Sequence, residues 1–119
     1  MTELKTEGGG AVYIADEVLT TIAGTAALEA EGVAGLAGYF SEAKNKTLRK
    51  HVSRGVQVRV SGQKVGLVLA ITAKMGTKLH KISADVQSRV KSAIETMTGL
   101  TVAEVNVTVS AVVAEEVKE

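Results

Sequence analysis

The sequence contains no cysteine, and this absence excludes several kinds of site. Disulfide bonds, thiolate metal centres and cysteine nucleophiles all require a thiol sulfur. A chain without cysteine is also compatible with a reducing compartment, where disulfides do not persist. Any chemistry in this chain must therefore come from other residue types.

Aromatic residues are also scarce, with one Phe, two Tyr and no Trp among the 119 residues. Large aromatic side chains anchor many protein interfaces and provide the platforms on which unpaired bases stack. The apolar residues are instead mostly Val, Ala, Ile and Leu, and they contribute most of a 45% hydrophobic fraction. Because a chain of this length buries roughly two-thirds of its unfolded surface, the composition predicts a single domain with one core.

Long apolar runs are missing as well. The longest candidate, Val65 to Ala73, has the length of a strand, whereas a membrane-spanning helix needs about 20 residues. Met1 to Gly10 is polar and glycine-rich and does not resemble a signal peptide. We therefore expect a cytoplasmic protein whose connection to a membrane is peripheral or made through a partner.

The net charge of +1 conceals an uneven distribution of charge. Residues 42–91 carry twelve Lys or Arg and two acids, a net charge of +10, whereas the two ends together carry −9. Such asymmetry indicates either internal pairing of complementary surfaces or an anionic partner for the middle. A solvated surface with short-range pairing is the simpler alternative.

The apolar pattern predicts four strands and two helices. Val56, Val58 and Val60 alternate with polar residues, as in a half-buried strand. Apolar residues recur at three- and four-residue steps up to Met97, as in an amphipathic helix. We expect Asp16 and Thr77 to be N-caps, and Gly32 and Gly99 to end the helices. The strands are predicted at residues 11–15, 55–61, 65–74 and 102–113, and the helices at 16–31 and 77–97.

This order predicts an α+β fold, a single βαββαβ domain with a small mixed sheet and both helices packed on one face. The domain is expected at residues 11–113, between a flexible N-terminal arm at 1–10 and an acidic tail at 114–119. Residues 33–54 are interpreted as a surface loop in which Tyr39 and Phe40 pack onto the core. The order of the strands stays open.

The sequence offers no recognisable catalytic or metal-binding pattern. His51 and His80 are the only histidines, and neither has metal-ligand spacing to other His, Asp or Glu residues. His80 and Asp85 lie five residues apart on a predicted helix, so they point in different directions. We expect a protein that is not an enzyme, with no cofactor and no metal.

The best candidate binding surface is a basic segment at residues 44–54. Its members are Lys44, Lys46, Arg49, Lys50 and Arg54. Since no aromatics lie among them, they would hold an anionic partner without base specificity, whether nucleic acid, lipid headgroups or an acidic protein. Gly32 to Gly35 and Gly35 to Gly38 match the G-x-x-G pattern of KH modules, but with apolar central residues. A solvated loop and a packed turn are the structural alternatives.

Several segments resemble the alkaline shock, or envelope stress response, protein family of Gram-positive bacteria. The resemblance covers about Gly10 to Val113. The matching segments are Gly10-Ala-Val-Tyr-Ile-Ala-Asp-Glu-Val18, Glu31-Gly-Val-Ala-Gly35, Val86-Gln87, and Ile94-Glu-Thr-Met-Thr-Gly-Leu100 running into Val105-Asn-Val-Thr-Val109. The basic residues at 44–51 occupy a variable region of the family.

The resemblance implies a non-catalytic stress protein concerned with cell-envelope homeostasis. It also implies a protein partner, a small membrane-anchored protein in some members, and brings no catalytic residues. Independently, the long Val-rich strand at 102–113 can leave an exposed edge, and exposed edges pair. We therefore also expect a homo-oligomer. A nucleic-acid-binding module that uses residues 44–54 is the alternative function.

Overall fold

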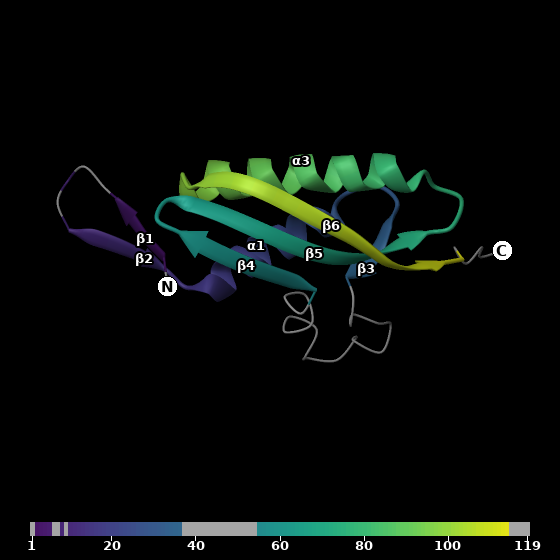
Figure 1. The fold of residues 1–119 in the computed structure, drawn as a ribbon, viewed down its shortest axis with the longest axis horizontal. Helices are drawn as coiled ribbons and strands as arrows, with labels where there is room; N and C mark the ends of the chain where they lie inside the picture. The colour runs from purple at the N-terminus through teal and green to yellow at the C-terminus, as the bar shows by residue number, and fades with distance from the viewer. Residues whose placement is uncertain (1, 6–7, 9, 37–54, 115–119) are drawn as a thin grey trace.

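The computed structural model describes residues 2–5, 8, 10–36 and 55–114 (Figure 1). These residues form six strands and two helices. In chain order the elements are β1 (Thr2–Lys5), β2 (Ala11–Ile14), α1 (Asp16–Leu28), β3 (Val33–Leu36), β4 (Val56–Ser61), β5 (Lys64–Lys74), α3 (Leu79–Thr98) and β6 (Thr101–Val113). The order agrees with the predicted βαββαβ arrangement apart from β1 and β3, which the prediction lacked.

Strand β5 is the centre of a mixed four-stranded sheet. One of its edges pairs antiparallel with β4, from Val56 opposite Leu69, and with β3, from Val33 opposite Ala73. Its other edge pairs in parallel with β6 over its whole length. Because β3 and β4 occupy successive parts of the same edge, β6 lies alone on the other side. The predicted mixed sheet is confirmed, but its predicted first strand is not part of it: β2 pairs with β1 in a separate two-stranded sheet, and β3 is the fourth strand of the mixed sheet.

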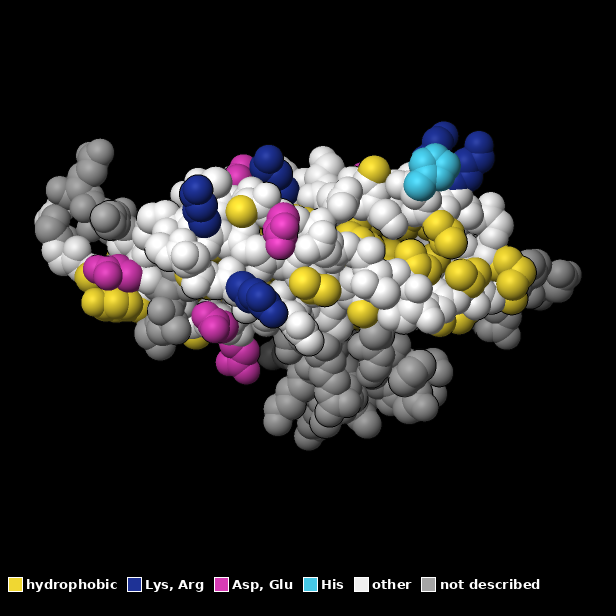
Figure 2. Space-filling view, viewed as in Figure 1, with side chains coloured by type: hydrophobic (Ala, Val, Ile, Leu, Met, Phe, Trp, Pro, Cys, Tyr) yellow, Lys and Arg dark blue, Asp and Glu magenta, His cyan; other side chains and the backbone are white. Residues whose placement is uncertain are grey.

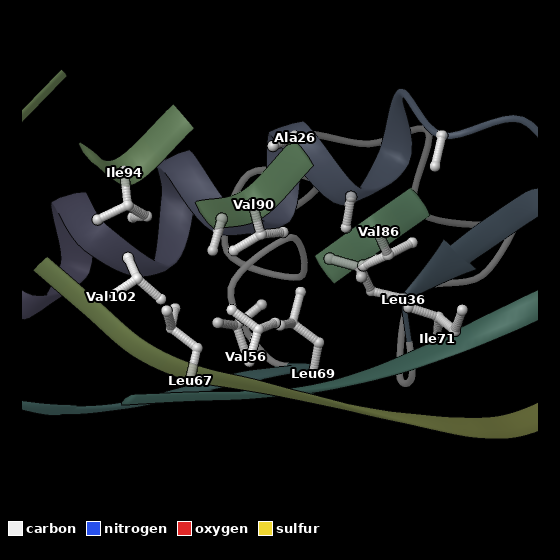
Figure 3. Packing of buried hydrophobic residues seen from close by; sticks show 14 of the residues in the cluster. Ala26, Leu36, Val56, Leu67, Leu69, Ile71, Val86, Val90, Ile94 and Val102 are labelled. Carbon is white, nitrogen blue, oxygen red and sulfur yellow. The ribbon is translucent and has the colours of Figure 1, made fainter. Parts of the chain in front are cut away.

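Both helices cover the same face of this sheet, as expected (Figure 1). The helices contact each other, and α3 also packs against β6, whereas α1 packs against β3 and β4. Figure 3 shows residues such as Val90 and Ile94 of α3 pointing toward Leu67 and Leu69 of β5. The core consists of aliphatic side chains. They lie on the inner faces because side chains repeat every 3.6 residues around a helix and every two residues along a strand.

Helix α3 ends as predicted, but it does not begin as predicted. Gly99 adopts the left-handed conformation with φ 78° and donates its N–H to the carbonyl of Glu95. At the start, Lys78 occupies the cap position and makes no side-chain capping bond. The predicted N-cap, Thr77, instead donates its hydroxyl to the carbonyl of Lys74 at 2.6 Å. That bond closes the turn that leaves β5.

Helix α1 is shorter than predicted. It ends at Leu28 rather than at residue 31, and Asp16 is its first helical residue rather than its N-cap, a position held by Ala15. The chain must leave the helix early because Gly32 already accepts a hydrogen bond from the N–H of Lys74 at the end of β5. Gly32 has φ 97°, a conformation that glycine adopts at low cost.

Two strands differ from the sequence-based expectation. β1 lies where the sequence predicts a flexible arm, and it pairs with β2 from Thr2 opposite Ile14 to Lys5 opposite Ala11. Leu4 packs against the core, which ties this hairpin to the domain. β3 lies at the start of the predicted surface loop, with Val33 and Leu36 buried. The remainder of that loop, with Tyr39 and Phe40, lies outside the described residues.

Candidate interaction surfaces

The predicted basic surface lies outside the described residues. Its members Lys44, Lys46, Arg49, Lys50 and Arg54 all fall within residues 37–54, as does His51. Their role as an anionic-partner surface therefore stays a prediction. The G-x-x-G match at Gly32 to Gly35 does lie in the described part, where it passes from a turn into β3. Its main chain there is engaged with β5, which favours the packed-turn interpretation.

The other predicted chemical groups lie apart on the surface. His80 is exposed on the first turn of α3. Asp85 accepts a hydrogen bond from Nε of Arg89 at 3.0 Å, an ion pair between successive helical turns. Across residues 2–5, 8, 10–36 and 55–114, no group of three or more His, Asp or Glu residues is arranged to hold a metal ion.

The outer edge of β6 is the most distinctive surface of the described structure. β6 has thirteen residues and pairs with β5 alone among the described strands. Its second edge therefore carries main-chain N–H and C=O groups that need other partners. Natural proteins protect such edges with charges, bulges, proline or a covering element. The two halves of this edge differ in that respect.

Two side chains of α3 cover the first half of the edge. Nε2 of Gln87 donates a hydrogen bond to the carbonyl of Val105 at 2.9 Å. Oε2 of Glu95 accepts a hydrogen bond from the N–H of Val102, also at 2.9 Å. Both bonds are partly buried. They satisfy main-chain groups that would otherwise be open to solvent or to another strand.

In the second half of the edge, no side chain of residues 2–5, 8, 10–36 or 55–114 provides such cover. Main-chain groups of alternate residues point to the same side of a strand, so the outward carbonyl of Val105 places the groups of Val107 and Val109 on the free edge. A register shift follows Val109. After it, Val113 accepts from the N–H of Met75, on the β5 side, which leaves Val112 facing outward. Among the described residues, no side chain hydrogen-bonds to β6 beyond Val105.

Apolar side chains surround this open half. Leu79 at the start of α3 is 41% exposed, Val112 is 43% exposed and Val113 is 41% exposed. Figure 2 shows hydrophobic side chains gathered between the beginning of α3 and the C-terminal half of β6. The only charged residue in β6 is Glu104, in the covered half. The open half is thus rich in valine, uncharged and unpaired with any other described strand, which are the properties of a strand that accepts another strand.

A second surface is a shallow groove between the two helices. Its hollow has a volume of about 400 Å³ and is lined by Ile22 and Ala26 of α1 and Ala93 and Met97 of α3, among others. Met97 is 69% exposed, and a methionine adapts its shape readily to a partner. This groove lies on the α1 side of α3, away from β6.

None of the helices in the described ranges is long and apolar enough to cross a membrane.

Comparison with protein families matches residues 4–114 to the alkaline shock protein 23 family, which is described as having a cell envelope-related function. The match spans almost the whole chain, including the β1–β2 hairpin and the full length of β6. The chain belongs to this family. The resemblance inferred from the sequence is therefore confirmed. The expected relation to the cell envelope is confirmed for the family as a whole.

Curated relatives of the chain come from Bacillus and Streptococcus. YloU of Bacillus subtilis is 35% identical over 113 residues, which is 92% of this chain and 93% of YloU. YqhY of the same organism is 31% identical, over 82% of this chain and 73% of YqhY. Spy1614 of Streptococcus pyogenes is 32% identical, over 82% of this chain and 84% of Spy1614.

The fold also resembles solved structures of low sequence identity. A variant of the MamM CTD in its zinc form superposes with a TM-score of 0.54 and 18% identity, covering 85% of this chain and 87% of that one. A second variant of the MamM CTD gives a TM-score of 0.51 at 15% identity, covering 86% of this chain and all of that one. At this level of identity the likeness concerns the fold alone.

Sequence reasoning identifies the exposed edge but not its two coverings. The Val-rich pattern predicts a long strand with a free edge, and the structure places β6 at the edge of the sheet. Gln87 and Glu95 stand out in the sequence only as members of family motifs. Whether a helical side chain reaches a strand's main chain depends on how helix and strand are aligned, which no local pattern encodes.

Proposed function

We propose that this chain is a non-enzymatic stress-response protein that acts in cell-envelope homeostasis through protein–protein interaction and self-association. It works in the cytoplasm near the inner face of the membrane, where a protein partner holds it. The family match supports the envelope role. The observation that carries the proposal is the open half of the β6 edge, an uncharged main-chain edge beside exposed Leu79, Val112 and Val113.

A second copy of the chain is the partner that this edge fits best. Two-fold pairing places identical strands antiparallel, so each copy presents the same surface to the other. Residues 105–113 carry no charge, and the pairing therefore brings no like charges together. It would bury the exposed valines of both copies and satisfy main-chain groups on both edges.

The membrane partner would use surfaces that self-association leaves free. The groove beside Met97 is lined by small and flexible side chains, the kind of surface into which an amphipathic helix packs. A small membrane-anchored protein with such a helix on its cytoplasmic side is the partner class that we propose for this envelope-related chain.

The test is localisation of a fluorescently labelled chain in stressed cells, with and without candidate membrane partners, together with cross-linked copurification. We expect enrichment at the cell periphery and copurification of an envelope protein. Met97→Lys should weaken that association, while Thr101→Lys, exposed on β6 and not among the residues that line the groove, should not. A freely diffusing chain that copurifies with no envelope component would contradict the proposal.

A nucleic-acid-binding function is the second candidate, and the net charge of +10 over residues 42–91 favours it. It predicts binding to RNA or DNA that weakens steeply as salt rises. The variant with Lys44, Lys46, Arg49, Lys50 and Arg54 all changed to Gln should then lose that binding. An unaltered mobility of nucleic acid with the wild-type chain at low salt would end this alternative.

A further inference from the structure

Strand pairing along β6 is limited by the helix that lies beside it. α3 and β6 are connected by Gly99 and Leu100, so the end of α3 lies beside the beginning of β6. The side chains at 79, 83, 87, 91 and 95 follow one another at four-residue steps, and the last four each come directly after a buried residue of α3, so they form a face that runs alongside the buried one. This face looks toward β6, because Gln87 and Glu95 both bond to it.

The chemistry of this face changes at Gln87. Toward the C-terminus of α3 the face carries three long polar side chains, Gln87, Lys91 and Glu95. Toward the N-terminus it carries the short Ser83 and the apolar Leu79. Within the described part of the chain, Leu79 and Ser83 make no side-chain hydrogen bond to β6, so the covered part of the edge ends where the long side chains end.

We infer that Gln87 and Glu95 close the first half of the β6 edge to strand addition and thereby confine pairing with a second copy to residues 107–113. This inference rests on the proposed self-association and adds its register. An incoming strand at 102–105 would have to displace two partly buried hydrogen bonds, whereas at 107–113 it meets main-chain groups to which no described side chain bonds.

A fixed register matters because a strand pair can otherwise slide. Displacing one strand by a single residue moves its side chains to the opposite face of the sheet. An edge of thirteen residues with a single charged side chain offers many alternative pairings. Gln87 and Glu95 remove those centred on the first half. The two-fold pair that the chain forms is therefore centred within residues 107–113.

Amide hydrogen exchange measured by NMR at low and high protein concentration tests this directly. The outward amides of Val107, Val109 and Val112 should exchange about tenfold more slowly when nine in ten chains are paired. The amide of Val102, bonded to Glu95, should exchange at the same rate at both concentrations. In the double variant Gln87→Ala and Glu95→Ala, protection should extend with concentration to Val102.

Control variants separate this effect from a change in folding. Glu95→Gln keeps an acceptor oxygen and should leave the wild-type pattern unchanged. Circular dichroism of each variant reports whether the domain is folded, and the core amides of β5 provide an internal reference in the exchange data. The double variant is expected to fold, because neither side chain belongs to the buried core and β6 remains paired with β5 along its whole length.

The outcomes distinguish the inference from the function on which it rests. Concentration-dependent protection of Val102 in the wild-type chain, equal to that of Val107, would show that pairing ignores the two side chains and would overturn the inference alone. The inference would also fail if the double variant protects only Val107 to Val112. No concentration-dependent protection anywhere along β6 would overturn the proposed self-association as well.

Discussion

At the scale of single residues, Thr98 joins the end of α3 to the beginning of β6. It is the buried polar residue of the described core, 9% exposed. Its hydroxyl donates to the carbonyl of Ile94 at 2.6 Å and accepts from the N–H of Leu100 at 3.1 Å. One hydroxyl thus satisfies two main-chain groups where the chain changes from helix to strand.

Replacing this hydroxyl should destabilise the fold. Thr98→Val keeps the shape of the side chain but leaves the buried N–H of Leu100 without its acceptor, so we expect a loss of about 1–3 kcal/mol in the free energy of unfolding. Urea denaturation measures this loss. Thr96→Val, on the exposed side of the same helix, is the control and should stay within about 0.5 kcal/mol of wild type.

Two glycines offer a matched comparison of strain with and without a steric clash. Gly32 and Gly99 both have positive φ, 97° and 78°. A Cβ at Gly99 would meet nothing within 4 Å, whereas one at Gly32 would lie 2.9 Å from Cγ1 and Cδ1 of the buried Ile82. Gly99→Ala should therefore cost about 1–2 kcal/mol from conformation alone. Gly32→Ala should cost more, and equal losses in urea denaturation would contradict this account.

At the scale of elements, the strong periodic segments could be predicted, whereas of the three four-residue strands only β2 could. The repeat of Ile82, Val86, Val90 and Ile94 identifies α3, because four buried residues at helical spacing leave no other arrangement. β1 and β3 have four residues each, too few to show a period. β3 can form because β5 continues past Leu69, the residue opposite the start of β4, and pairs with β3 from Ile71 to Ala73.

The two faces of α3 should respond differently to truncation. Ile94 is fully buried, whereas Met97, one turn later, is 69% exposed on the groove. Ile94→Ala should lower the free energy of unfolding by about 2–5 kcal/mol, through lost burial and the cavity left behind. Met97→Ala should change it by less than about 0.5 kcal/mol. Comparable losses in thermal or urea denaturation would show that Met97 serves the core.

The candidate surfaces are partly predictable at this scale. The alternation of Val105, Val107 and Val109 predicts a long strand, and such a strand can leave an exposed edge. The groove beside Met97 is not predictable, because it depends on how α1 and α3 pack together. The basic segment at 44–54 follows from charge alone, and its role stays a prediction.

At the scale of the whole molecule, the two candidate surfaces lie on different sides of the helix layer. α3 stands between them, with β6 on one side and α1 on the other. A pair joined through β6 would therefore keep both grooves accessible. This arrangement suits a scaffold, because self-association does not compete with binding of a second protein.

The central claim is that the open half of β6 joins two copies of the chain, and sedimentation equilibrium over a range of concentrations tests it most directly. We expect a reversible monomer–dimer equilibrium for the wild-type chain. Val112→Lys places a charge on the exposed end of the open edge and should shift the equilibrium to monomer, while Gln57→Lys on β4 should not. A wild-type chain that remains monomeric at high concentration, or a dimer that Val112→Lys leaves intact, would contradict the account.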